Sequence, residues 1–218
     1  MNNRRQGILL TFLTLTLPFT LGLGEKSSIV GSPHNLSVTG PGLIKSVNET
    51  RICIFCHSSH NASSEGPLWN HETTRSSGFK TYQRSTLQAL PSQPNGATKL
   101  CLSCHDGTIA VGSVHSVPGG IKMQGVAAGG EIPASRKAHL GSDLSGTHPV
   151  SIKFEQAQAM NKSNLRWPPL DPEREVGVDA DGYVQCTSCH NPHGSRSETL
   201  PFWNKDSFGK VCMVCHGY

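Results

Sequence analysis

The cysteines of this 218-residue chain constrain its fold most, because all eight lie in four copies of one short motif. Each copy is a Cys-x-x-Cys pair followed at once by a histidine. The four copies are Cys53-Ile-Phe-Cys56-His57, Cys101-Leu-Ser-Cys104-His105, Cys186-Thr-Ser-Cys189-His190 and Cys212-Met-Val-Cys215-His216. The fold must therefore accommodate the same chemistry four times within one small protein.

Cys-x-x-Cys-His is the attachment motif of c-type haem. Two thiols three positions apart can each bond one vinyl group at the porphyrin edge, and the adjoining imidazole then lies beneath the iron. The eight cysteines are thus predicted to attach four haem c groups covalently. The predicted proximal ligands are His57, His105, His190 and His216.

Two other uses of paired cysteines fit the pattern less well. Zinc sites can be built from Cys-x-x-Cys pairs, but zinc does not require a histidine immediately after every pair. Disulfides are common in exported proteins, yet a bond within Cys-x-x-Cys closes too short a loop to hold a fold together. Haem attachment accounts for both the thiols and the histidines.

The composition indicates what kind of core such a chain can have. Only 35% of the residues are hydrophobic and 6% aromatic, and glycine and proline together make 37 of 218. This argues against long helices or a large sheet. We expect a loop-rich, mostly irregular fold with short α-helices around four haems, whose porphyrins form the core. Without them the apoprotein is expected to be largely unfolded.

Residues 1–24 have the pattern of a secretory signal peptide. Arg4 and Arg5 precede an apolar stretch over residues 8–23, and Gly22-Leu23-Gly24 is a small-residue cleavage site. A membrane anchor is the alternative, but threonines and a proline dilute the stretch. We expect cleavage, a haem-binding domain over residues 25–218, no membrane insertion afterwards, and a periplasmic or extracellular location.

The charge of the processed chain excludes some partners. Residues 1–24 hold two of the 19 basic residues and no acidic one, so the remaining chain has a net charge of +2. That balance indicates neither nucleic acid nor an anionic membrane surface as a partner.

The order of features occurs twice, at approximately residues 25–111 and 140–218, on either side of a glycine-rich linker. Each repeat has a histidine, a first motif with another histidine three positions later, a Pro-x-Trp-Asn segment and a second motif. The matched features are His34 with His148, His60 with His193, and Pro67-Leu-Trp-Asn70 with Pro201-Phe-Trp-Asn204.

Seven histidines lie outside the four motifs, and four irons need four distal ligands to become six-coordinate. The repeat selects four of the seven. The predicted distal ligands are His34, His60, His148 and His193. No role is assigned to the remaining three, which are His71, His115 and His139.

Two of these ligands follow a proximal histidine by three positions. On a continuing helix, His60 and His193 would point to the same side as their own proximal ligand. They cannot easily reach the opposite face of the same iron. We therefore expect each to bind a neighbouring haem, which would bring two porphyrins close together.

The whole set of motifs resembles the multihaem cytochromes with doubled CxxCH motifs, and in particular the small tetrahaem cytochromes of the OmcE type. The segments that carry the resemblance are Ser32-Pro-His34-Asn-Leu-Ser37, Cys56-His57-Ser-Ser-His60-Asn-Ala62, Pro67-Leu-Trp-Asn70, Cys104-His105-Asp-Gly-Thr108, Thr147-His148-Pro-Val150 and Cys189-His190-Asn-Pro-His193. The resemblance implies redox proteins or extracellular electron acceptors as partners. It also implies a possible homopolymer in which His34 ligates the iron of a neighbouring subunit.

Three functions follow from these features. The first is an electron carrier or wire with four closed irons and no catalytic residue. The second is a haem-containing reductase subunit, which needs an open iron beside a pocket and often a Cys-x-x-Cys-Lys motif, a variant that this sequence lacks. The third is a structural filament that conducts, which differs from the first only in assembly. The histidine supply favours the carrier.

Overall fold

The computed structural model describes residues 28–85, 87, 89–160, 164–166, 171, 173, 175–194 and 202–217. The signal peptide predicted for residues 1–24 lies outside these ranges. Within the described part of the chain, no helix combines the length and the apolar character that crossing a membrane requires.

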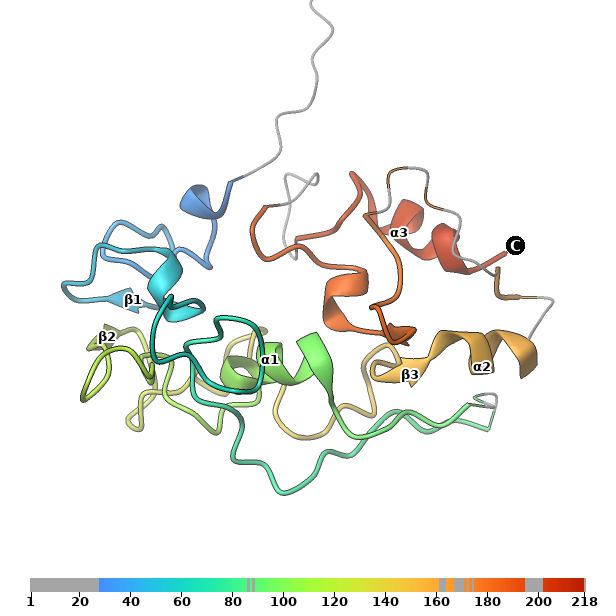
Figure 1. Ribbon diagram of the computed structural model, residues 1–218, viewed down its shortest axis with the longest axis horizontal. Coiled ribbons are helices and arrows are strands. Elements are labelled where there is room, and N and C mark those ends of the chain that lie inside the picture. The colour runs from blue at the N-terminus through green and yellow to red at the C-terminus, as the bar shows by residue number, and fades with distance from the viewer. Residues whose placement is uncertain are drawn as a thin grey trace, which may run out of the picture.

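Regular structure is short and sparse in the described chain (Figure 1). The helices are the 3-10 helices η1 (Ile29–Gly31), η2 (Cys53–Phe55) and η3 (Cys186–Ser188), and the α-helices α1 (Gly96–His105), α2 (Phe154–Met160) and α3 (Phe208–Cys215). The strands form two antiparallel pairs, β1 (Lys45–Ser46) with β2 (Met123–Gln124) and β3 (Ile152–Lys153) with β4 (Tyr183–Val184). Loops connect these elements and position the motifs.

Motifs that occupy the same position in the two repeats have the same local backbone. The first motif of each repeat lies on a 3-10 helix, η2 or η3, and the second lies at the end of an α-helix, α1 or α3. Within each 3-10 motif the histidine N–H donates to the carbonyl of the first cysteine, at 2.8 Å in η2 and 3.0 Å in η3. This bond closes one turn that holds both thiols and the imidazole together.

The Pro-x-Trp-Asn segment folds back on the first motif of its repeat. In both repeats its tryptophan forms a β-bridge with the proximal histidine, and its asparagine N–H donates to the carbonyl of the second cysteine at 2.9 Å. The bridged pairs are His57 with Trp69 and His190 with Trp203. The two repeats therefore share a tertiary feature as well as a sequence pattern.

The glycine-rich residues 112–146 pack beside the first repeat. Strand β2 pairs with β1, and Val114 and Ile121 pack against Ile54 and Phe55 of the first motif. Gly125 has a φ of +72°, and a Cβ there would collide with the backbone carbonyl oxygen of Leu43, which lies just before β1. Glycine is needed here both for the positive φ and for the close approach of two backbones.

The buried apolar side chains of the described residues form four small clusters, and each includes or contacts a residue of a Cys-x-x-Cys-His motif or its helix. Two clusters have four buried members and two have three. Representative members are Phe55, Phe154, Leu102 and Val211. In the described part of the chain, these clusters are separate and do not form one continuous core of protein side chains.

The two repeats meet at α1. In Figure 1, β1 of the first repeat lies on the left, α2 and α3 of the second lie on the right, and α1 lies between them, while the segment before α1 runs beneath α2. The buried Gln185, which precedes the third motif, accepts a hydrogen bond from the Thr98 N–H of α1 at 3.1 Å. The Thr98 hydroxyl accepts another from the Cys186 N–H at 3.1 Å. These bonds fix η3 against the helix that carries the second motif.

Candidate functional site

Three pairs of imidazole rings lie at nearly the same separation. Each pair joins a proximal histidine to one of the predicted distal histidines. The distances between ring centres are 6.1 Å for His34 and His105, 6.0 Å for His57 and His193, and 6.2 Å for His148 and His216. The structure thus brings together six of the eight predicted iron ligands in three pairs.

This separation fits a metal held between two imidazoles. A metal–imidazole bond is about 2 Å long and the ring centre lies roughly a further 1 Å behind the nitrogen, so two coaxial rings on one metal have centres about 6 Å apart. Rings in direct contact also have centres about 4.5–7 Å apart, so what points to a metal is that each pair joins a motif histidine to a histidine from outside the motifs. The donor geometry therefore fits iron closed by two histidines.

Hydrogen bonds at Nδ1 determine which ring nitrogen is left to bind a metal. The Nδ1 atom of His34 lies 3.4 Å from the Pro192 carbonyl oxygen, and that of His105 lies 2.7 Å from the carbonyl oxygen of Ala138. The Nδ1 atom of His148 lies 2.9 Å from its neighbour's carbonyl oxygen. An N–H that donates to a carbonyl leaves Nε2 as the metal-binding nitrogen.

The surroundings of these rings favour the neutral form that ligates metals. Burial lowers the pKa of His105. Burial and then the facing imidazole lower the pKa of His34, His57 and His216. Two charged imidazoles with ring centres about 6 Å apart would repel each other, so the neutral form of both is favoured.

Thiols of successive Cys-x-x-Cys-His motifs lie near each other. Burial and then the nearby Cys104 raise the pKa of Cys56, which belongs to the first motif, to about 12. A hydrogen bond to Cys186 raises the pKa of Cys101, which places the second motif against the third. Burial and then Cys215 of the fourth motif raise the pKa of Cys189 to about 12. Each motif therefore lies near the next one in the chain.

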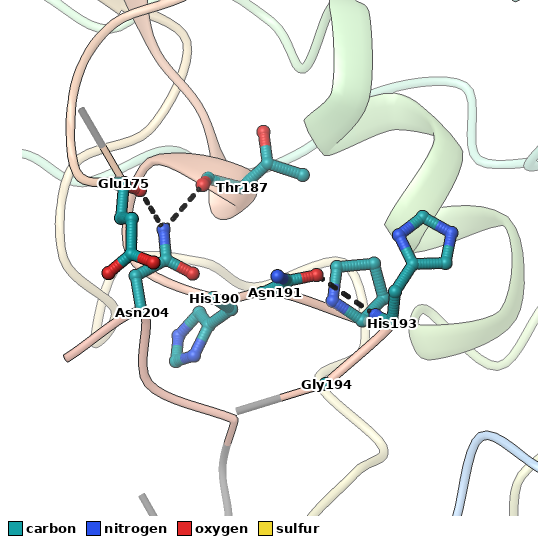
Figure 2. Close-up of a pocket in the computed structure, with 8 residues that line it drawn as sticks. Glu175, Thr187, His190, Asn191, His193, Gly194 and Asn204 are labelled. Atoms are coloured by element: carbon teal, nitrogen blue, oxygen red, sulfur yellow. Dashed lines mark hydrogen bonds between the residues drawn. The ribbon is translucent and has the colours of Figure 1, made fainter. Parts of the chain in front are cut away.

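His193 faces the first motif instead of its own. Figure 2 shows the rings of His190 and His193 directed to different sides of the loop that joins them. His193 lies 6.0 Å from His57, in the other repeat. His193 thus faces a motif other than its own, as expected, but not from a continuing helix, because η3 ends at Ser188 and the two rings point to different sides.

A cavity of about 290 Å³ lies beside the third motif (Figure 2). His190 lines it, and the Trp203 ring stacks on His190 with centres 4.5 Å apart. The other lining residues are Glu175, Thr187, Asn191, Pro192, His193, Gly194 and Asn204. The third motif thus has open space beside its imidazole.

His60, the repeat counterpart of His193, has a different position. Its side chain is exposed, and its backbone N–H donates to the Ser58 hydroxyl at 3.3 Å. Among the ring contacts of the described residues, none pairs His60 with a proximal histidine. The fold therefore pairs six of the predicted ligands in the part of the chain that the structure describes.

The three histidines without an assigned role differ in their environments. His71 is fully buried, with Nδ1 2.7 Å from the Glu72 carbonyl oxygen and Nε2 3.1 Å from that of Ala110. The Nε2 atom also lies 3.4 Å from the Cys104 Sγ atom, which places the buried ring beside the second motif. His139 packs against Gly107, whose φ of +73° and lack of Cβ admit the ring. His115 is exposed.

Comparison with protein families gives one match. Residues 179–218 match the model of the doubled CXXCH motif, and this range covers the third and fourth motifs. The match supports these two as c-type cytochrome haem attachment motifs, which bind haem c covalently and are typical of electron-transfer proteins. The two motifs of the first repeat lie outside the matched range. A search of curated proteins finds no match.

Proposed function

We propose that this protein is an exported tetrahaem c-type cytochrome that transfers electrons through haems closed by two histidines each. The observation that carries the proposal is the set of three imidazole pairs at 6.0–6.2 Å, each made of a motif histidine and a histidine from outside the motifs. Iron porphyrin supplies one-electron chemistry when bound. The chain supplies the thiols, the paired imidazoles and their spacing.

The order of the motifs supports transfer along a row. The thiols of successive motifs are near enough to shift each other's pKa, as Cys104 does for Cys56, Cys186 for Cys101 and Cys215 for Cys189. The ligand pair His57–His193 also ties the first motif to the loop after the third. Electrons would enter at one end of this row and leave at the other.

Extracellular acceptors and end-to-end assembly extend the proposal. Their support is the resemblance to tetrahaem cytochromes and the pattern of residues 1–24. His34 lies opposite His105 of its own chain, which favours a ligand role within the subunit over the role between subunits that the resemblance implied.

The alternative is a haem-containing reductase subunit. The cavity of about 290 Å³ beside His190 does not favour it, because the haem of the third motif would itself take up space beside His190. An enzyme of this kind needs an iron with an open position, whereas a carrier needs none. Carbon monoxide binding separates the two.

The experiment uses the secreted, fully haem-loaded protein. Its intact mass should exceed that of the chain by four haems, and the ferrous protein titrated with carbon monoxide should keep its absorption spectrum. Any other haem number contradicts the tetrahaem proposal. Rapid adduct formation at one haem in the unaltered protein favours the reductase.

Ligand variants sharpen this test. His193→Ala and His148→Ala should each create one haem that binds carbon monoxide, because each removes one member of an imidazole pair. His115→Ala is the matched control and should bind none, since His115 is exposed and outside the pairs. Variants of His193 and His148 that bind no carbon monoxide would overturn the assigned coordination.

A further inference from the structure

Two successive residues contact imidazoles that belong to different haem motifs. The Phe202 ring stacks on His34 with centres 4.7 Å apart and planes 7° from parallel. The next ring, that of Trp203, stacks on His190 at 4.5 Å and 27°. His34 faces the second motif, and His190 belongs to the third. The dipeptide therefore lies between the ligands of two neighbouring haems.

The backbone holds Phe202 in an uncommon conformation. Its φ is +66°, in the left-handed region that side chains other than glycine, asparagine and aspartate rarely adopt. The Asn191 N–H donates to the Phe202 carbonyl at 2.9 Å. The following Asn204 donates through Nδ2 to the Thr187 carbonyl at 3.1 Å. These bonds attach Phe202 and the segment after it to the third motif and the residue that follows it, and such strain persists where the surroundings impose it.

The first repeat shows that the conformation does not require an aromatic ring. Leu68 occupies the matching position with a φ of +56°, and the Ser58 N–H donates to its carbonyl at 2.9 Å. Leu68 is 56% exposed. The turn is thus the same in both repeats, and what the second repeat adds is a ring placed flat against a distal histidine.

We propose that Phe202 is a positioning residue that sets the plane of the His34 imidazole and, together with Trp203, couples the ligands of the second and third haem motifs. Rotation of His34 about its metal–nitrogen axis would tilt its ring out of parallel with Phe202 and drive the two rings together. The stack therefore holds the angle between the His34 and His105 planes, which is 69°.

The angle between axial ligand planes has a spectroscopic consequence. Parallel planes split two of the iron d orbitals strongly, whereas nearly perpendicular planes leave them close in energy. His57 and His193 lie 18° apart, while His148 and His216 lie 82° apart. Ferric haems in this protein should thus give low-spin electron paramagnetic resonance signals of more than one class. The inference rests on the proposed function, since it requires His34 and His105 to ligate one iron.

The test compares Phe202→Leu, Phe202→Tyr and Leu68→Ala in the haem-loaded protein. Phe202→Leu keeps a residue that the first repeat accommodates at this φ but removes the ring. We expect one low-spin signal and one step of the potentiometric titration to shift. Phe202→Tyr retains the stacked face and should restore both. Leu68→Ala, the matched control, should leave every signal in place.

His34→Ala separates this inference from the proposed function. Loss of the ligand should give one haem that binds carbon monoxide. If it does not, the pairing of His34 with His105 is wrong. If it does, and Phe202→Leu still leaves all signals and potentials unchanged, the positioning role alone is overturned. Phe202→Met provides the same comparison if Phe202→Leu does not accumulate with its haems.

Discussion

At the scale of single residues, Lys205 shows how the two repeats diverge. It aligns with His71, and both side chains are buried. The Lys205 Nζ atom lies 2.6 Å from an Asp171 oxygen and 2.7 Å from a Glu173 oxygen. The Asp171 side chain is only 2% exposed. Where the first repeat places a ring between backbone carbonyls, the second places a buried ion pair.

Lys205→Met should therefore destabilise the haem-loaded protein. Removing one partner of a buried ion pair leaves the other charge uncompensated, at a cost of about 3–5 kcal/mol in the free energy of unfolding. Lys210→Met is the control, because its ion pair with Asp206 is well exposed and should contribute no more than about 1 kcal/mol. Denaturant unfolding followed by circular dichroism measures both. Equal losses in the two variants would contradict the buried role.

The same ion pair predicts a dependence on pH. Burial acts to raise the pKa of Asp171, but hydrogen bonds from Lys205 and from three backbone N–H groups bring it below its ordinary 3.8. A carboxyl with a lowered folded-state pKa stabilises the fold above its ordinary pKa and loses that contribution as the pH falls through the folded value. In Asp171→Asn, the free energy of unfolding should therefore fall less steeply below about pH 4 than in the unaltered protein. An unchanged pH profile would argue against the pairing.

At the scale of elements, the structure repeats a unit of one 3-10 motif and its Pro-x-Trp-Asn segment. The asparagine ends the segment in both copies. Asn70 is fully buried and donates through Nδ2 to the Ile54 carbonyl, while Asn204 donates to the Thr187 carbonyl. Both carbonyls belong to the residue after the first cysteine. The side chain thus locks the segment to the turn that would carry the haem.

Asn70→Ala and Asn204→Ala should each lower the free energy of unfolding by about 1–3 kcal/mol, since each leaves a motif carbonyl without its hydrogen bond. Thermal and denaturant unfolding of the haem-loaded variants measure the loss. Asn48→Ala is the matched control, because that side chain is exposed and its removal should change stability by at most about 0.5 kcal/mol. A loss in the control as large as in the other two variants would remove the special role of the segment.

At the scale of the whole molecule, the protein core is divided. The buried apolar side chains of the described residues form separate clusters of three or four, and two of these clusters pack against Cys215 of the fourth motif. Clusters of this size bury little apolar area, and the entropy of ordering so loop-rich a chain is large. Large apolar groups bound between the clusters would join them into one core.

A chain with all eight motif cysteines changed to serine should therefore be largely unfolded. Far-ultraviolet circular dichroism should show no native-like signal, and heating should give no cooperative transition. The haem-loaded protein at the same concentration is the comparison. A cooperative transition in the serine variant would show that the protein side chains suffice.

The repeat pattern of the sequence predicts a good part of the candidate site. It selects His34, His148 and His193 from the seven histidines outside the motifs, and the structure places each opposite a proximal histidine. It does not predict the exposed position of His60. It also gives no sign that residues 112–146 pack on the first motif, because their glycines form irregular turns without periodicity.

The sequence by itself determines the local chemistry. A Cys-x-x-Cys-His turn closes through one backbone hydrogen bond between residues four apart, so thiols and imidazole are adjacent in any fold that forms the turn. Only the tertiary structure decides which distal histidine meets which motif and that Phe202 stacks on His34. The Nδ1 atom of His34 reaches a carbonyl 158 residues away. Such contacts depend on how many irregular loops pack together, and no short-range pattern encodes that packing.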